Sequence, residues 1–131
     1  MTIEWIAPNS VLATHKRQIA EHGGTEGVRD EGLLLSAIAR PENLYAYGEN
    51  ADLSSVAASY AFGIAKNHAF LDGNKRTALV VAVTFLNVNG YDFDAPREET
   101  YKIFLQLAEG SISEDDLAAW LRERVQEITP D

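Results

Sequence analysis

Nine consecutive residues, His68 to Arg76, bring together an imidazole, a carboxylate, a glycine, an amide and two cations in the order HAFLDGNKR. They stand just before a long apolar run, Ala78 to Val88, so the end of the segment falls at the first turn of an expected helix. Free N–H groups and the positive end of the helix dipole attract anions at such a place. The residue types and their spacing therefore predict a loop suited to phosphate chemistry.

Two side chains of this loop are the candidates for the chemistry itself. His68 is placed to take the proton from an attacking hydroxyl, a contribution typically worth roughly 10²- to 10⁴-fold in rate. Asp72 is a hard oxygen ligand, and a single carboxylate together with nucleotide phosphates and water is the usual way in which a protein holds Mg²⁺. An aspartate two residues before a helix can instead cap it, and of these two roles we favour the metal.

The residues that follow form an expected phosphate cradle. Gly73 lets the backbone approach a ligand closely, and the N–H groups of Asn74, Lys75 and Arg76 would point out of the helix start. Arg76 adds a planar fork for phosphate oxygens, while Lys75 adds a point charge that can follow charge developing in the transition state. Lys66 supplies a further cation beside the loop, and we include it in the phosphate-binding set.

Length and composition limit what surrounds this loop. With 131 residues, 46% of them hydrophobic, the chain is expected to form one compact domain spanning residues 1–131. The absence of cysteine excludes disulfides and thiolate zinc sites, and no leader or membrane-spanning run is recognisable, so we expect a cytoplasmic protein. A net charge of −9 argues against direct nucleic-acid binding and against an anionic membrane surface, because most of the domain would repel phosphate groups. Any phosphate ligand therefore needs a local basic pocket.

Apolar periodicity predicts helix after helix, and Asp30, Asp52 and the pair Ser113 and Asp116 are the expected N-terminal caps of three of them. The segment 74–89 is apolar on nearly every side, and although its β-branched residues alone could suggest a strand, its length and the terminal Asn89-Gly90 favour a buried central helix. Pro41 should end the second helix, since the residue before a proline resists the helical region. The expected fold class is all-α, a compact bundle of about six helices. The predicted helices span residues 10–21, 30–38, 53–67, 74–89, 97–109 and 114–127, with a loop or small hairpin at 41–50 and a turn at 91–96.

The central loop resembles the signature of the Fic/Doc family, H-x-F-x-(D/E)-(G/A)-N-(G/K)-R, and matches it at every specified position. The N-terminal half, from Gly23-Gly24 to Arg40-Pro41, is similar to the Doc (death on curing) branch. This resemblance implies an all-helical Fic fold and transfer of a phosphate-containing group from a nucleotide to a protein hydroxyl. For the Doc branch it also implies the toxin half of a toxin–antitoxin pair.

One position of the signature bears on which group is transferred. Adenylylating members usually have glycine where this chain has Lys75, whereas the Asn-Lys-Arg of the Doc branch implies a reversed nucleotide and transfer of the terminal phosphate. Gly73 follows the adenylylating pattern, whereas the best-known Doc pattern has alanine at this position. The long cationic side chain of Lys75 changes the pocket more than the methyl group of an alanine would. The resemblance thus implies an ATP- and Mg²⁺-dependent kinase that modifies a Ser or Thr of a translation factor, elongation factor Tu by family. Protein adenylylation is the alternative, and a non-catalytic protein-binding module is a second one.

Regulation and target binding are also implied by the resemblance. The inhibitory motif of many relatives, (S/T)-x-x-x-E-(G/N), does not occur in this sequence, so a Phd-like antitoxin with a disordered tail is expected to fold onto the cleft. The segment Arg40 to Tyr47, including Tyr45, corresponds to the flap with which relatives hold the target segment. An ordinary surface loop is the alternative for this segment.

Overall fold

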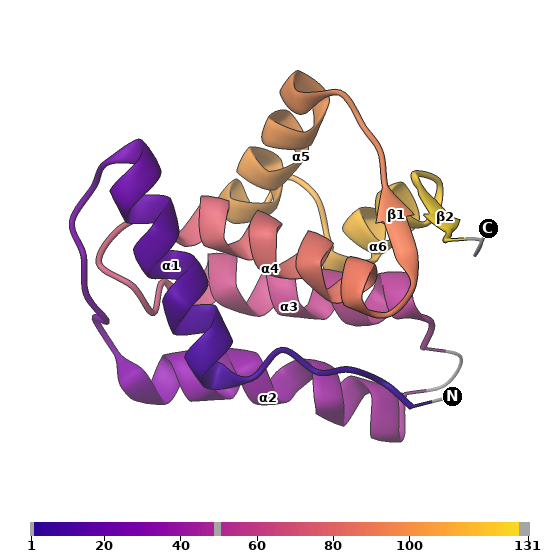
Figure 1. The fold of residues 1–131 in the computed structure, drawn as a ribbon, viewed down its shortest axis with the longest axis horizontal. Coiled ribbons are helices and arrows are strands. Elements are labelled where there is room, and N and C mark those ends of the chain that lie inside the picture. The colour runs from indigo at the N-terminus through magenta and orange to yellow at the C-terminus, as the bar shows by residue number, and fades with distance from the viewer. Residues whose placement is uncertain (1, 49–50, 129–131) are drawn as a thin grey trace.

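A computed structural model describes residues 2–48 and 51–128, and in these ranges the chain forms six α-helices and one small antiparallel sheet (Figure 1). The expected all-α fold is confirmed. The elements are α1 (Pro8–His22), α2 (Glu31–Tyr47), α3 (Leu53–Asn67), α4 (Asn74–Val88), β1 (Tyr91–Phe93), α5 (Arg97–Glu109), α6 (Glu114–Arg122) and β2 (Val125–Glu127).

The centre of the bundle is α3, not α4 as the sequence predicted. Helices α2, α4, α5 and α6 all contact α3, which is rich in small residues, whereas α4 leaves one side open and its Val88 is half exposed. Small side chains allow close approach: a Cβ added to Gly63 would lie 3.2 Å from the Cα and the carbonyl oxygen of Ala37 on α2. Hydrophobicity alone identified α4 as the centre, but close packing favours the helix with the smaller side chains.

Helix α2 continues through Pro41 to Tyr47, so the loop predicted from residue 41 is wrong up to residue 47; residues 49–50 lie outside the described ranges. Proline removes one backbone donor and crowds the preceding turn, at a cost of about 3 kcal/mol. Tertiary packing offsets this cost here. Pro41 is buried, and Tyr45 packs edge-on against Trp5 of the N-terminal segment with ring centroids 5.8 Å apart.

The C-terminal segment also differs from the prediction. Helix α6 ends at Arg122 instead of residue 127, and β2 pairs with β1, where a simple turn was expected. The sheet packs on α6 through Phe93, whose ring centroid lies 5.6 Å from that of Trp120. Such a pairing joins segments about thirty residues apart in the chain, and local periodicity carries no information on it.

Several helix ends are those that the sequence predicted. The side chains of Asp30 and Asp52 accept hydrogen bonds from the backbone N–H groups three residues on, at the starts of α2 and α3. Ser113 and Asp116 form the expected capping box of α6. Within the described ranges, each helix is too short or too polar to cross a bilayer.

We expect part of the stability to depend on an ion pair between α3 and α6. Arg122 donates from Nε to Asp52 Oδ2 at 2.6 Å and from Nη2 to Oδ1 at 3.1 Å, and this hydrogen-bonded pair lowers the pKa of Asp52 from 3.8 to about 2. A carboxyl whose pKa is depressed in the folded state stabilises the fold above its unfolded pKa and loses that effect as the pH falls towards 2. Since both side chains are nearly half exposed, the contribution is only about 0.5–1 kcal/mol.

The test is urea unfolding of the wild type and of Asp52→Asn at pH 6 and at pH 2. The wild type should be more stable than the variant at pH 6, and the difference should be much smaller at pH 2, where the pH has reached the pKa of Asp52 in the folded state. Asp92→Asn removes the same charge from an exposed position on β1, away from Arg122, and serves as the control. An Asp52→Asn difference that persists unchanged at pH 2 would contradict this role of the ion pair.

Candidate active site

His68 is the residue after α3, and its backbone is left-handed with φ 50°. Histidine adopts this conformation more readily than most residues, but it still needs support. Arg29 supplies that support: its Nε donates to the His68 carbonyl at 2.7 Å and its Nη2 to the Asn67 carbonyl at 3.1 Å. Arg29 therefore caps the end of α3 that presents the exposed imidazole, a role the sequence did not reveal.

Phe70 holds the loop in the core. Its side chain is 1% exposed, and its ring stacks flat on the ring of His15 in α1, with centroids 3.7 Å apart. His15 Nε2 lies 2.8 Å from the carbonyl oxygen of Asp72. A carbonyl only accepts, so this nitrogen carries a proton and donates it. His15 thus ties α1 to the loop at two points, Phe70 and Asp72.

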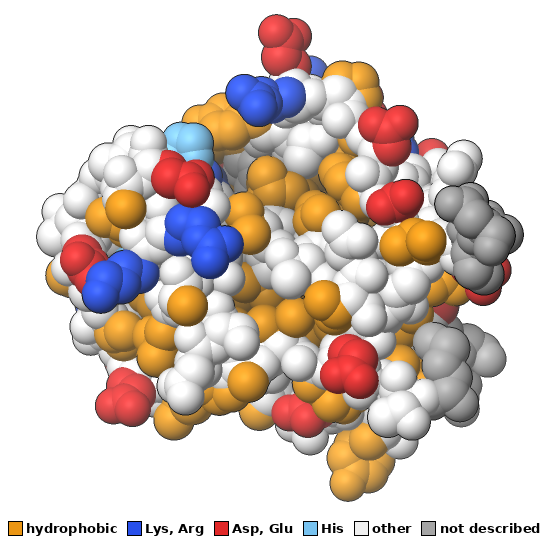
Figure 2. Space-filling model, in the orientation of Figure 1, with side chains coloured by type: hydrophobic (Ala, Val, Ile, Leu, Met, Phe, Trp, Pro, Cys, Tyr) orange, Lys and Arg blue, Asp and Glu red, His pale blue; other side chains and the backbone are white. Residues whose placement is uncertain are grey.

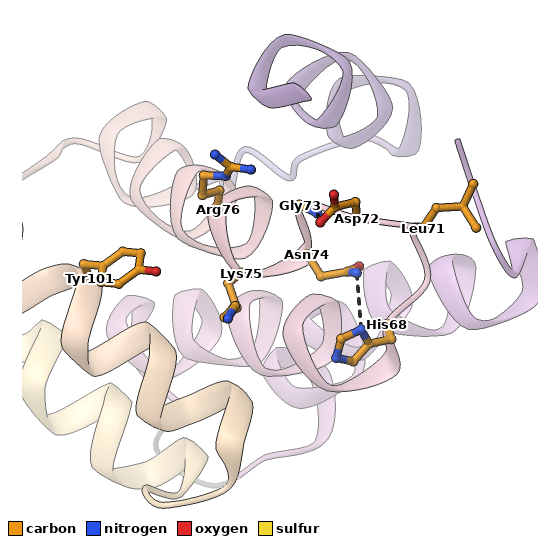
Figure 3. Close-up of a pocket in the computed structure, with 8 residues that line it drawn as sticks. All are labelled: His68, Leu71, Asp72, Gly73, Asn74, Lys75, Arg76 and Tyr101. Carbon is orange, nitrogen blue, oxygen red and sulfur yellow. Dashed lines mark hydrogen bonds between the residues drawn. The ribbon is translucent and has the colours of Figure 1, made fainter. Parts of the chain in front are cut away.

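Asn74 holds the loop together through two hydrogen bonds to the backbone of Phe70. Its side chain is buried, its Oδ1 accepts from the Phe70 N–H at 3.1 Å, and its Nδ2 donates to the Phe70 carbonyl at 3.0 Å. These two bonds fix which way the amide faces, so Nδ2 is the atom 3.4 Å from His68 Nδ1 (Figure 3). This separation is long for a hydrogen bond, so the imidazole is oriented by Asn74 but only weakly engaged.

The connection between α1 and α2 wraps around the outside of the loop. Leu71 N–H donates to the Gly27 carbonyl at 3.0 Å, and Val28 pairs with Phe70 in an isolated antiparallel bridge. Gly24 lies so close that an added Cβ would stand 2.7 Å from an Asp72 carboxylate oxygen, and its φ of 119° favours glycine. This segment, residues 23–30, is therefore the part of the chain that covers the loop.

Asp72 is exposed and carries its negative charge at neutral pH. The hydrogen bond from the Gly73 N–H, at 2.9 Å, and then that from the Thr25 N–H, at 3.3 Å, hold the pKa of its carboxyl below the ordinary value. Among the described residues this carboxylate bonds to the N–H of the N-cap residue Gly73 and to that of Thr25 and not to an N–H within α4, so the alternative role as a cap of this helix is wrong. Those ranges also contain no cluster of three or more His, Cys, Asp and Glu side chains suited to a metal. Asp72 therefore fits Mg²⁺ only if phosphate oxygens and water complete the coordination.

These elements open onto a cavity of about 460 Å³ at the start of α4 (Figure 3). Gly73, with φ 74°, is the residue before α4 and has no side chain to cap the helix. Among the described residues, the first N–H groups of α4 are therefore left for a ligand. Arg76 also donates to the Gly23 carbonyl at 3.3 Å, and its charge helps to lower the pKa of Asp72. The lining residues are His68, Leu71, Asp72, Gly73, Asn74, Lys75, Arg76 and Tyr101.

Lys66 does not line this cavity. Its Nζ donates to the carbonyl of Ala108 at 3.3 Å, near the C-terminal end of α5, and an added Cβ on Gly110 would lie 3.1 Å from the same nitrogen. The preference of cations for a helix C-terminus explains this placement. We therefore remove Lys66 from the phosphate-binding set.

The segment predicted as a flap, residues 40–47, is helical. Arg40, Tyr45 and Tyr47 belong to the second half of α2, whereas it is the start of α2 that adjoins the loop, where Asp30 N–H donates to the Ala69 carbonyl (Figure 1). Arg40 pairs with Glu114 of α6 at 2.6 Å, so its charge serves the fold. The flap prediction is wrong because Pro41 does not end the helix.

Two lining residues were missed from the sequence. Leu71 lies inside the signature at a position that the pattern leaves open. Tyr101 comes from α5, far along the chain, and only the tertiary fold brings it to the loop. For His15 a signal did exist, because Val11, His15 and Ile19 follow the helical spacing of a buried stripe.

Comparisons with known proteins identify the family of this chain. The model of the Fic/DOC family matches residues 5–86, so the chain belongs to the Fic/DOC family. It is 39% identical over 118 residues to "Protein kinase doc" of Escherichia phage P1, an alignment that covers 89% of this chain and 92% of that protein. It is 46% identical over 82 residues to "Toxin Doc" of Mycolicibacterium smegmatis (59% of this chain, 63% of that protein). Within the family the chain therefore groups with the Doc branch.

We expect His15 to determine how firmly the loop is held. His15→Ala removes both the stack on Phe70 and the hydrogen bond to the Asp72 carbonyl, and each 1.4 kcal/mol lost locally should speed amide hydrogen exchange by about tenfold. The reporters are the N–H groups of Phe70 and Leu71, which are bonded within the site. His15→Phe keeps a ring for the stack and should have a smaller effect.

Two controls separate this local effect from general destabilisation. The amides of α6 report global opening and should exchange much less rapidly than those of the loop in the same variant. His22→Ala changes an exposed histidine at the end of α1 and should leave the loop unaffected. Equal acceleration in the loop and in α6 would show that His15 acts on global stability alone.

Proposed function

We propose that this protein is a Doc-type toxin that acts as an ATP-dependent protein kinase. It transfers the terminal phosphoryl group to a Ser or Thr hydroxyl of a translation factor, elongation factor Tu on the family resemblance. One observation carries the proposal: the exposed imidazole of His68 opens onto the same cavity as Lys75, Arg76 and the uncapped start of α4. A proton acceptor thus adjoins a phosphate site.

In the proposed reaction the acceptor oxygen attacks the γ-phosphorus of ATP. His68 takes the hydroxyl proton, a bond forms between the acceptor oxygen and phosphorus, and the bond from phosphorus to the bridging oxygen breaks, so that ADP leaves. Lys75, Arg76 and the first N–H groups of α4 stabilise the negative charge on the phosphate oxygens. The hydroxyl either displaces Asn74 from His68 Nδ1 or meets Nε2 in the other tautomer, and the 3.4 Å contact makes both changes inexpensive.

A magnesium ion would be held by Asp72 together with the nucleotide. Asp72 is ionised, lines the cavity and keeps lone pairs free beside those that accept from Gly73 and Thr25. When bound, the ion neutralises charge on the phosphate oxygens. The backbone hydrogen bonds of Asp72 hold its carboxylate in place for this role.

Lys75 is the residue on which the choice of phosphoryl transfer depends. Its side chain is exposed at the cavity, where adenylylating relatives usually have no side chain at all. The name of the phage relative, "Protein kinase doc", supports the same choice. Adenylyl transfer to the same hydroxyl is the alternative chemistry on this scaffold.

The name "Toxin Doc" of the second relative supports the proposed toxin–antitoxin pairing. We propose a Phd-like antitoxin whose disordered tail folds onto the cleft, and action in the cytoplasm without contact to membrane or nucleic acid. On the face drawn in Figure 2, basic side chains are few and acidic side chains lie beside them. Together with a net charge of −9, this favours a protein target over a polyanion.

The deciding experiment incubates the protein and the candidate target with Mg²⁺ and ATP labelled at either the γ or the α phosphate. Label from the γ position alone should appear on the target, and the antitoxin should suppress it. Label retained from the α position would show adenylyl transfer instead. A protein that inhibits growth without transferring either label would support a non-catalytic binding module.

A further inference from the structure

Tyr101 lines two adjoining cavities. One is the 460 Å³ cavity of the candidate active site, and the other is an apolar recess of about 20 Å³ between α4 and α5. In Figure 3 the tyrosine extends from α5 towards Arg76, while His68 lies on the opposite side of Lys75. The recess is lined by Lys75, Arg76, Leu79, Tyr101, Phe104 and Leu105.

The side chain of Tyr101 is not needed to pack α5 against the rest of the fold. That helix is anchored by the buried side chains of Thr100, Phe104 and Leu107, whereas Tyr101 is 58% exposed. Leu79 and Leu105 are half-buried beside it. An open aromatic face with an apolar floor, next to two cations, suits a flat aromatic group that carries phosphates.

We propose that Tyr101, with Leu79 and Leu105, forms a nucleobase subsite on which the base of the nucleotide stacks. The proposal rests on the proposed function, since it names where the nucleoside end of the same donor binds. The recess is too small to enclose a purine, so the base lies across its mouth against the tyrosine ring. Stacking on an aromatic side chain tolerates any base, because every base has a π-face.

This subsite also sets the direction of the nucleotide. Figure 3 shows Tyr101 and His68 on opposite sides of Lys75, so a nucleotide with its base at Tyr101 would extend its phosphates past Arg76 and Lys75 towards His68. The terminal phosphate is then the group nearest the imidazole. The position of Tyr101 therefore favours transfer of that phosphate over transfer of the nucleotidyl group.

The test is calorimetric titration with Mg²⁺ present, comparing ATP with inorganic tripolyphosphate, which lacks a base. Tyr101→Ala should weaken ATP binding by roughly 5- to 100-fold and leave tripolyphosphate binding unchanged. Tyr101→Phe retains the ring and should bind ATP within about twofold of the wild type, since only the hydroxyl is lost. Tyr47→Ala removes an exposed tyrosine at the far end of α2 and is the matched control.

Each contrary result has a distinct meaning. If the wild type binds ATP and Tyr101→Ala binds it equally well, the subsite is wrong while the proposed function stands. If Tyr101→Phe is as weak as Tyr101→Ala, or if tripolyphosphate binding falls equally, the hydroxyl contacts phosphate and the stacking proposal is overturned. If the wild type binds neither compound, the proposed function fails and the subsite with it.

Discussion

Replacing His68 with asparagine should reduce the rate of label transfer from the γ-phosphate by about 10²- to 10⁴-fold and leave the fold intact. The loss follows from removing the proton acceptor at the mouth of the cavity. The fold should survive because the imidazole is exposed and, among the described residues, its one side-chain hydrogen bond is the 3.4 Å contact with Asn74. Asparagine is chosen because it tolerates the left-handed backbone at this position, whereas alanine would add strain.

The measurements are single-turnover transfer rates, the ATP dissociation constant and the thermal midpoint. Nucleotide binding and the midpoint should change little, so the defect should lie in the chemical step. His22→Asn alters another exposed histidine, outside the cavity, and should retain the wild-type rate. A His68→Asn variant with normal transfer would exclude the imidazole as the base, whatever its effect on growth.

Replacing Phe70 with alanine should cause the largest loss of stability, about 3–5 kcal/mol. The ring is 1% exposed and stacks on His15, so its removal leaves a cavity between α1 and the loop. Because natural domains are stable by only about 5–15 kcal/mol, the thermal midpoint should fall by roughly 10–20 °C. Transfer activity should also fall, since the carbonyl and N–H of Phe70 are the groups that Asn74 clamps.

Leu71 offers a matched control for stability one residue further on. Its side chain is 53% exposed, so Leu71→Ala should change the free energy of unfolding by less than about 0.5 kcal/mol. Phe70→Leu keeps an apolar side chain and should lie between the two. The measurement is urea unfolding of all three variants. If Phe70→Ala unfolds at the same urea concentration as Leu71→Ala, the anchoring role of the ring is wrong.

Local signals in the sequence predicted most of the helices. Asp30, Asp52 and Ser113 cap the helices that they were expected to cap, because a side chain bonded to a backbone N–H three residues on needs nothing from elsewhere in the chain. The prediction that Pro41 ends the second helix was wrong, because packing of α2 against the N-terminal segment outweighs the local preference of proline to end a helix. Prediction from the sequence failed again at β2, because a strand pairing across about thirty residues leaves no local mark.

Within the site, the sequence by itself determined the order of groups from His68 to Arg76, and with it the family. It also determined that a helix begins directly after Gly73. Only the tertiary structure decided that Arg29 and His15 brace this loop, that Lys66 turns towards α5 and that Tyr101 faces the cavity. The physical reason is distance along the chain: contiguous residues share backbone geometry, whereas contacts between separate helices depend on how the whole core packs.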